Sequence, residues 1–443
     1  LLSSGAVTVN GGELALGTTA QTVGALFLSG GAINGGVLTG TSYTVEAGTI
    51  GTVLSGALVA LTKNDVGTVL LNGSNQYGGG TTLNAGTLLL GSSERLLDSG
   101  SVTLNGGVFD LANYSETIGM LTLRGGSVIN GSLFASVFNL EVGTVNTVFS
   151  GAAKVVKTTG GLVDLLSANT YSGGTEIYDG TLRLGANNRL PVTGALTVFG
   201  GALELNSYTQ SVGTVRLSNG VISGGTLTGT SYVVEVGTIS AVLAGSGVTL
   251  TKSEIGSVLL SAVNTYTGTT TVGGGTLSLG VDNALALGTS VVVSGGALAL
   301  GTTTQSVAAL TLNGGLLSGG TLTGTSYAVN AGTISTVLAG GSIVLTKSEG
   351  GTVLLTGANT YGGGTVVNAG TLLLGGDERL LASGALTQAG GVFNLGGFTQ
   401  TLGAVTLNVG TTTSGTLSGA SYSVLSGDIS ANLAGNGALT KTS

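Results

Sequence analysis

Cysteine and histidine are both absent from the 443-residue chain. Without cysteine the chain forms no disulfide and no thiolate metal site. Without histidine it lacks the commonest general acid, general base and metal ligand, which excludes serine or cysteine triads of the usual composition. Any enzyme activity would therefore have to rely on carboxylates.

Charge is also scarce. The chain has 12 Lys and Arg against 19 Asp and Glu, a net charge of −7, and so no basic surface for nucleic-acid phosphates or anionic lipids. Long apolar runs are missing, because Gly, Thr, Ser or Asn interrupts them well before the roughly 18 to 20 residues that span a bilayer. The sequence predicts no nucleic-acid partner and no membrane insertion of this segment.

Proline occurs once, at Pro191, and no proline-rich or charged linker divides the chain. We therefore predict one continuous domain over 1–443. The 85 glycines are interspersed with Val, Leu, Ile and Thr, and 42% of all residues are hydrophobic. Disorder requires the opposite balance, so the chain should fold.

The chain is an array of one repeated unit. Lysines recur at intervals of 94 or 95 residues, an Asn-x-Tyr tripeptide recurs at the same interval, and so does a second aromatic series. This period predicts about 4.7 repeats, with approximate units 1–95, 96–189, 190–284, 285–379 and 380–443. The three series are Lys63, Lys157, Lys252, Lys347 and Lys441; Tyr77, Tyr171, Tyr266 and Tyr361; and Tyr43, Phe138, Tyr232, Tyr327 and Tyr422.

Each repeat reads as short strands separated by turns, with no helical periodicity. Gly-Gly pairs recur once per repeat and predict turns that need positive φ or close backbone approach. With three strands per coil, the spacing predicts an all-β parallel β-helix with about four rungs of about 24 residues per repeat. A propeller or a string of sandwiches fits less well, because blades repeat at about 40 to 50 residues and sandwiches need linkers. The pairs are 11–12, 106–107, 200–201, 295–296 and 390–391.

Few residues of the sequence are grouped in a way that could support catalysis. The nearest approach to a carboxylate cluster is Glu176 and Asp179, with Asp164 about one rung away and Arg183 nearby in sequence. A glycosidase needs two carboxylates roughly 5 to 9.5 Å apart, whereas scattered charges on a solenoid keep it soluble and discourage lateral strand pairing. We therefore predict no catalytic, cofactor-binding or metal-binding residues, no cofactor and no enzyme activity.

The repeated side chains are interpreted as structural. Lys63, Lys252 and Lys347 are followed by acidic residues and resemble exposed turn pairs. The tyrosines should anchor turns or core rather than form a sugar-binding row, because equivalent rings lie several rungs apart. A repeated Arg at Arg95, Arg189 and Arg379 gives way to Ala284 in one repeat, which favours a structural role over binding.

The stretch 345–375 resembles the autotransporter-associated β-strand repeat of bacterial autotransporter passenger domains. It contains Leu345-Thr346-Lys347 and Asn359-Thr360-Tyr361, and similar stretches occur at 61–91, 155–185 and 250–280. The resemblance implies a right-handed parallel β-helix displayed outside a Gram-negative-type cell, and says little about activity. Residues 1–5 match 96–100, and the chain also ends within a repeat, so we expect it to be part of a longer protein.

These observations predict an extracellular structural or adhesive β-helical stalk at a bacterial cell surface, without catalytic activity. One alternative is a subunit of an extracellular filament, since uncovered rungs expose strand edges that favour end-to-end stacking. A glycan-active β-helix enzyme is a third reading. The expected partners are other copies of the chain, end to end, or cell-surface or matrix glycans or proteins.

Overall fold

The computed structural model describes residues 1 and 3–442; Leu2, which falls within the predicted match of 1–5, and Ser443 lie outside the described residues. The chain divides into two compact bodies. The N-terminal body comprises Leu1–Val215 and Asn219–Leu227, and the C-terminal body comprises Arg216–Ser218 and Thr228–Ser443. Each is described by itself, and the single domain over 1–443 stays a prediction.

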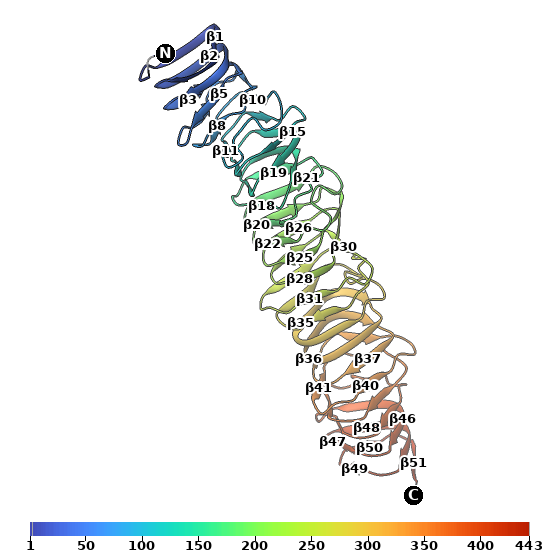
Figure 1. The fold of residues 1–443 in the computed structure, drawn as a ribbon. Coiled ribbons are helices and arrows are strands. Elements are labelled where there is room, and N and C mark those ends of the chain that lie inside the picture. Colours follow the sequence, from blue (N-terminus) through green and yellow to red (C-terminus); the bar gives the residue numbers. More distant parts are fainter. Residues whose placement is uncertain (2, 443) are drawn as a thin grey trace. The chain divides into compact units, whose positions relative to one another are not determined.

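The N-terminal body is a coil of short parallel strands, and its strands β1 to β21 are drawn in blue to green in Figure 1. A first wall and a second wall run through the coil, each strand pairing in parallel with the next strand of its wall. Strands β5 (Val53–Gly56), β8 (Gln76–Tyr77) and β13 (Ser115–Thr117) belong to a third wall.

The first wall comprises β6 (Leu61–Lys63), β9 (Thr81–Leu83), β11 (Ser101–Leu104), β14 (Met120–Leu123), β16 (Val137–Leu140), β18 (Lys154–Lys157), β20 (Thr175–Ile177) and β22 (Leu196–Val198). The second wall comprises β7 (Thr68–Leu71), β10 (Thr87–Leu90), β12 (Val108–Asp110), β15 (Ser127–Phe134), β17 (Gly143–Ser150), β19 (Leu162–Leu165), β21 (Thr181–Leu184) and β23 (Ala202–Glu204).

This arrangement confirms the all-β parallel β-helix, but the predicted rung length is wrong. Five steps lead from Val7 to Val102, each 17 to 21 residues long, so a repeat holds five rungs and not four. The rungs are shorter than 24 residues because the turns are tight and because some strands continue from one wall into the next without a loop. Strand β2 (Ala25–Thr39), for example, pairs with β3 (Ser42–Val45), β4 (Gly48–Ile50) and β5.

The core lies inside the coil. Strand side chains alternate between buried and partly exposed, as expected for strands with one face toward an apolar interior. Val102, Leu121 and Phe138 occupy equivalent positions on consecutive rungs and are at most 1% exposed. Each such side chain contributes on the order of 1.5 to 3 kcal/mol by leaving water, while the parallel backbone ladders satisfy the amides.

The C-terminal body follows the same plan. Its longest strands, β35 (Val291–Ser306) and β36 (Ala309–Thr323), pair in parallel with several register shifts. Strands β37 (Ser326–Val329), β40 (Leu345–Lys347), β42 (Thr365–Val367) and β44 (Leu386–Gln388) form the corresponding first wall of this body. The repeat thus builds the same rung sequence in both bodies.

The Gly-Gly turns require glycine for the predicted reasons. Gly107 has φ of +74°, and a Cβ there would lie 2.5 Å from the carbonyl oxygen of Gly86 on the preceding rung. Gly201 and Gly391 show positive φ and the same close approach to the rung before. Gly296 lacks the positive φ, yet a Cβ there would meet Gly274 backbone atoms at 2.8 Å.

Candidate functional site

Four of the five repeated lysines are buried, which corrects the interpretation of Lys63, Lys252 and Lys347 as exposed turn pairs. Lys441 is exposed. Lys157 at the end of β18 lies in register with Leu140 and Ile177, and its side chain points into the core with 0% exposure. Its Nζ donates to the backbone oxygen of Thr159 and, at 3.2 Å, to that of Asp179 on the next rung. Carbonyl oxygens rather than carboxylates therefore hold the ammonium. Lys63, Lys252 and Lys347 are likewise 0% exposed and bond to carbonyls in the same way.

A glycine makes room for each ammonium group. Gly180 has φ of +68°, and a Cβ on it would lie 2.6 Å from Lys157 Nζ. A Cβ on Gly86 would likewise lie 2.6 Å from Lys63 Nζ. Burial lowers the pKa of the Lys157 ammonium, and the Asp179 carboxylate opposes that effect. The lysine side chain fills one corner of the core beside the glycine, and its hydrogen bonds to backbone carbonyl groups join consecutive rungs.

The Asn-x-Tyr tripeptide joins three rungs. Asn169 Oδ1 accepts from Phe149 N at 2.8 Å, and its Nδ2 donates to Ser167 O at 3.0 Å and to Arg189 O at 2.8 Å. The Tyr171 hydroxyl shares a 2.6 Å hydrogen bond with Thr175 Oγ1, and burial raises the pKa of that hydroxyl. Asn75, Asn264 and Asn359 make corresponding bonds.

The second aromatic series anchors turns, as predicted. The Tyr43 hydroxyl accepts from Gly40 N and donates to Leu38 O, both at 2.8 Å. Its ring also meets Tyr77 edge to face at 6.0 Å, so the two aromatic series touch each other. Phe138, which lacks the hydroxyl, instead stacks on Phe149 at 3.9 Å.

The repeated arginines also bind turns, which confirms the structural reading. Arg189 Nη1 donates to Leu166 O on the preceding rung at 2.6 Å, and Nε donates to Asn187 O at 3.0 Å. Arg95 and Arg379 make equivalent bonds to backbone oxygens.

One buried carboxylate was missed. Glu116 in β13 is 0% exposed, and its two oxygens accept from Arg95 N at 2.8 Å and Leu96 N at 2.7 Å. Burial raises its pKa to about 7, although these backbone hydrogen bonds oppose the shift. The equivalent position in later repeats holds Gln210, Gln305 or Gln400. Comparison of the repeats in the sequence could have found this exception.

The carboxylates singled out in the sequence do not share one site. Asp164 and Arg183 form a two-pronged ion pair at 2.6 and 2.9 Å. Glu176 pairs with Lys154 at 2.6 Å, and Asp179 Oδ1 accepts from the backbone N of Gly180 at 2.7 Å. Each of the three carboxylates thus has a different charged or hydrogen-bonding partner.

The residue after each first-wall strand forms a column along one corner of the coil. Most members are polar: Asn84 Nδ2 donates to Asn64 at 2.7 Å, and Asn105 Nδ2 donates to Asn84 at 2.8 Å. Tyr178 and Phe199 interrupt this corner column. Their rings stack at 4.7 Å with an interplanar angle of 13°, and the two residues are 47% and 38% exposed.

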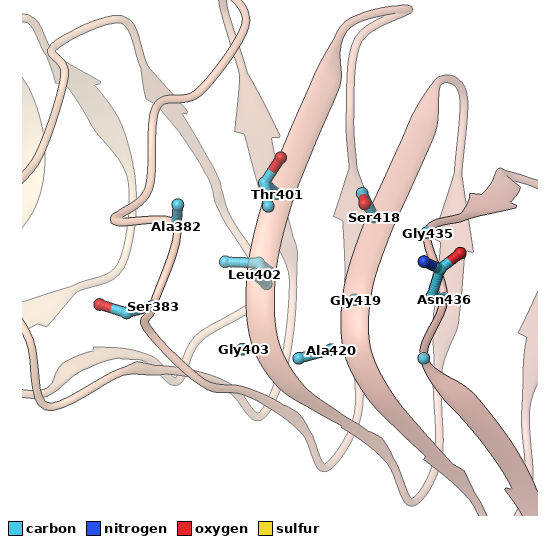
Figure 2. A pocket seen from close by; sticks show the side chains of 11 residues that line it. Ala382, Ser383, Thr401, Leu402, Gly403, Ser418, Gly419, Ala420, Gly435 and Asn436 are labelled. Atoms are coloured by element: carbon cyan, nitrogen blue, oxygen red, sulfur yellow. The ribbon is translucent and has the colours of Figure 1, made fainter.

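One groove lies in the C-terminal body and has a volume of about 560 Å³. Figure 2 shows its open wall of small side chains, including Ser383, Thr401 and Ser418, with Asn436 at one side. No titratable residue lines this groove. Among residues 1 and 3–442, no three acidic side chains gather as a metal-binding group, and no helix is long and apolar enough to cross a membrane.

Comparison with known proteins matches the same rungs. The passenger-associated-transport-repeat family matches residues 61–90, 155–184, 250–279 and 345–374, stretches that contain the buried lysine, the Asn-x-Tyr motif and the corner glycine. No solved structure matches the chain.

Two curated relatives are autotransporters. The adhesin BmaC autotransporter of Brucella suis biovar 1 (strain 1330) is 31% identical over 425 residues, covering 80% of this chain and 12% of that protein. The probable autotransporter YfaL of Escherichia coli (strain K12) is 27% identical over 437 residues, covering 90% of this chain and 33% of that protein. The chain thus spans a third or less of these relatives' lengths. The chain thus carries four passenger-associated-transport-repeats and is similar to these autotransporters along most of its own length.

Proposed function

We propose that this chain is a surface-displayed, adhesive passenger segment with no catalytic activity. The observation that carries the proposal is how the repeated polar side chains are used. The buried lysines, the Asn-x-Tyr motifs and the arginines all bond to backbone groups of their own or neighbouring rungs. Such residues stabilise a scaffold, which supports presentation of a surface rather than turnover. The name of one relative, an adhesin, agrees with this role.

Cell-surface attachment tests the proposal. The natural full-length protein would be produced in a non-adherent bacterium, alongside an in-frame deletion of residues 1–443. We expect antibodies against this segment to label intact cells and attachment to an epithelial layer to fall several-fold on deletion. Labelling only after the cells are broken open, or unchanged attachment with equal display of the remaining protein, would contradict it.

End-to-end assembly into a filament stays a prediction. Parallel strands that pair rung by rung provide the geometry in which one copy could continue another. Electron microscopy of the purified native protein distinguishes the two cases: separate particles support a passenger that acts alone, and long uniform fibres support the filament.

The enzyme alternative predicts release of sugar products. We expect no reducing ends above background when the chain is incubated with bacterial or plant polysaccharides, because Glu176 and Asp164 are each held in their own ion pair. A measurable release that disappears in Glu176→Gln would overturn this expectation, whereas release unaffected by that variant would point to a contaminating enzyme.

A further inference from the structure

Four neighbouring surface positions hold residue types that differ from those at the equivalent positions of the adjacent repeats. Lys154, Glu176, Tyr178 and Phe199 correspond one period earlier to Ala60, Thr82, Asn84 and Asn105. One period later the same positions hold Thr249, Thr271, Gly273 and Ser294. The equivalent positions lie at corresponding strands, and none of them holds a charged or aromatic residue, so formation of these strands does not require the four side chains. Their joint change indicates a local surface with another use.

The four side chains lie on consecutive rungs of the N-terminal body. Glu176 joins them, because Oε1 accepts from Lys154 Nζ at 2.6 Å and Oε2 accepts from the Tyr178 hydroxyl at 3.2 Å. The Phe199 ring lies nearly parallel to the Tyr178 ring. The result is an exposed pair of aromatic rings beside a carboxylate, an ammonium and a hydroxyl; we name it the aromatic patch.

The charges of the aromatic patch select its ligand. Lys154 and Glu176 neutralise each other, so a strongly cationic or anionic ligand gains little and meets one like charge. A neutral pyranose matches both halves of the patch. Its C–H face carries the slight positive charge that aromatic π-systems attract, and its hydroxyl groups can accept from the ammonium and donate to the carboxylate.

We propose that Tyr178, Phe199, Lys154 and Glu176 form a binding site for a neutral, pyranose-containing glycan. The proposal rests on the proposed adhesive function and names the class of molecule that this passenger contacts. Tyr178 and Phe199 supply the apolar contact, and the ion pair orients the sugar hydroxyl groups. This site is distinct from the two periodic aromatic series, whose rings are buried.

Saturation-transfer NMR with the 443-residue chain tests the site. The probes are methyl glycosides of glucose, galactose, mannose and N-acetylglucosamine, and short oligosaccharides of each. We expect saturation transfer to at least one series, reduced about tenfold or more in the Tyr178→Asn/Phe199→Asn variant. That variant copies the Asn84 and Asn105 ladder and should keep the fold, to be checked by circular dichroism. Leu287→Asn, at an exposed apolar residue in the other body, should bind as the unaltered chain does.

A gain of function provides a second test. The quadruple variant Ala60→Lys, Thr82→Glu, Asn84→Tyr and Asn105→Phe rebuilds the aromatic patch one period earlier and should bind about twice as many glycan molecules per chain.

No saturation transfer to any probe, or equal saturation transfer from the unaltered chain and the Tyr178→Asn/Phe199→Asn variant, overturns the proposal. If attachment of cells persists while no glycan binds, only this inference fails. Loss of attachment in the Asn variant without glycan binding assigns the patch to a protein ligand and also overturns it.

Discussion

A buried lysine ammonium that bonds only to backbone carbonyls is an uncommon core element, since burial of a charge is costly unless it is well hydrogen-bonded. In this protein the same arrangement recurs at Lys63, Lys157, Lys252 and Lys347. The side chain fills the core with its methylenes and joins two turns with its Nζ. Four similar environments within one chain allow each variant to be compared with its own internal controls.

Lys157→Ala should destabilise the N-terminal body by about 2 to 4 kcal/mol. The substitution leaves a cavity beside Ile177 and removes the donor to Thr159 O and Asp179 O. Denaturant unfolding followed by circular dichroism measures the change. Lys154→Ala removes a partly exposed ammonium three residues away and should cost less than about 1 kcal/mol; an equal loss in both variants would contradict a special role for Lys157.

Glu116 should make stability depend on pH between its unfolded and folded pKa values. Because the folded pKa is raised to about 7 from 4.5, the folded state binds the proton more tightly than the unfolded state. The resulting stabilisation is complete below about pH 4.5 and is lost as pH rises through about 7. Glu94, Arg95 and Tyr77 are the neighbouring ionisable groups, and Arg95 limits the shift in the Glu116 pKa.

Glu116→Gln should therefore stabilise the protein at pH 8 and have little effect at pH 4. The expected difference is on the order of 3 kcal/mol from the size of the pKa shift, measured by chemical unfolding at a series of pH values. Gln305→Glu provides the reverse comparison in another repeat and should introduce a similar pH dependence. An equal stability difference at both pH values would show that the carboxyl group does not titrate in this range.

At the scale of elements, the third wall depends on the Asn-x-Tyr motif because these short strands supply few ladder bonds of their own. Asn169→Ala leaves Phe149 N, Ser167 O and Arg189 O without their side-chain partner. We expect a loss of about 2 to 4 kcal/mol and faster amide hydrogen exchange at Phe149. Asn146→Ala removes an exposed side-chain bond to Ser167 and is the matched control; unchanged exchange in Asn169→Ala would contradict the assignment.

Much of this architecture could be predicted from the sequence, because period and alternation are properties of residue order. The direction of the lysines could also have been predicted: in Leu61-Thr62-Lys63 the leucine points inward, so Lys63, two residues on, does too. Rung length could not be derived from the period alone, since 95 residues divide into four long or five short coils. Only the observed register, with steps such as Tyr43 to Leu61, decides between them.

The aromatic patch shows the other limit of sequence reasoning. The periodic tyrosines drew attention because they repeat, whereas Tyr178 and Phe199 matter because they do not. Their 21-residue separation becomes a direct contact only when the rung length is known. Positions that break a repeat are therefore where recognition residues should be sought in this chain.

At the scale of the whole molecule, one full period should be removable. Deletion of residues 64–157 joins Lys63 to Thr158 and presents Thr159 O in place of Asp65 O to the ammonium, in the same register. We expect a folded protein with strand-rich circular dichroism and a cooperative unfolding transition. Deletion of residues 64–147 removes a non-integral number of rungs, so that Val148–Ser150, which pair with Ser132–Phe134, would directly follow a first-wall strand. The strands would then lose their partners, and the variant should aggregate. Equal solubility of both variants would contradict the need for register.

The similarity of the lysine–glycine turns in successive repeats also affects how the gene could gain or lose repeats. Since each period occupies a whole number of codons, unequal crossing-over between the DNA segments that encode Lys63 and Lys157 would add or delete a complete repeat without a frameshift. Daughter cells would then carry passengers with different repeat numbers, each closed by the same lysine and glycine. A change in repeat number by whole periods would therefore keep both the lysine–glycine turn and the register of the rungs.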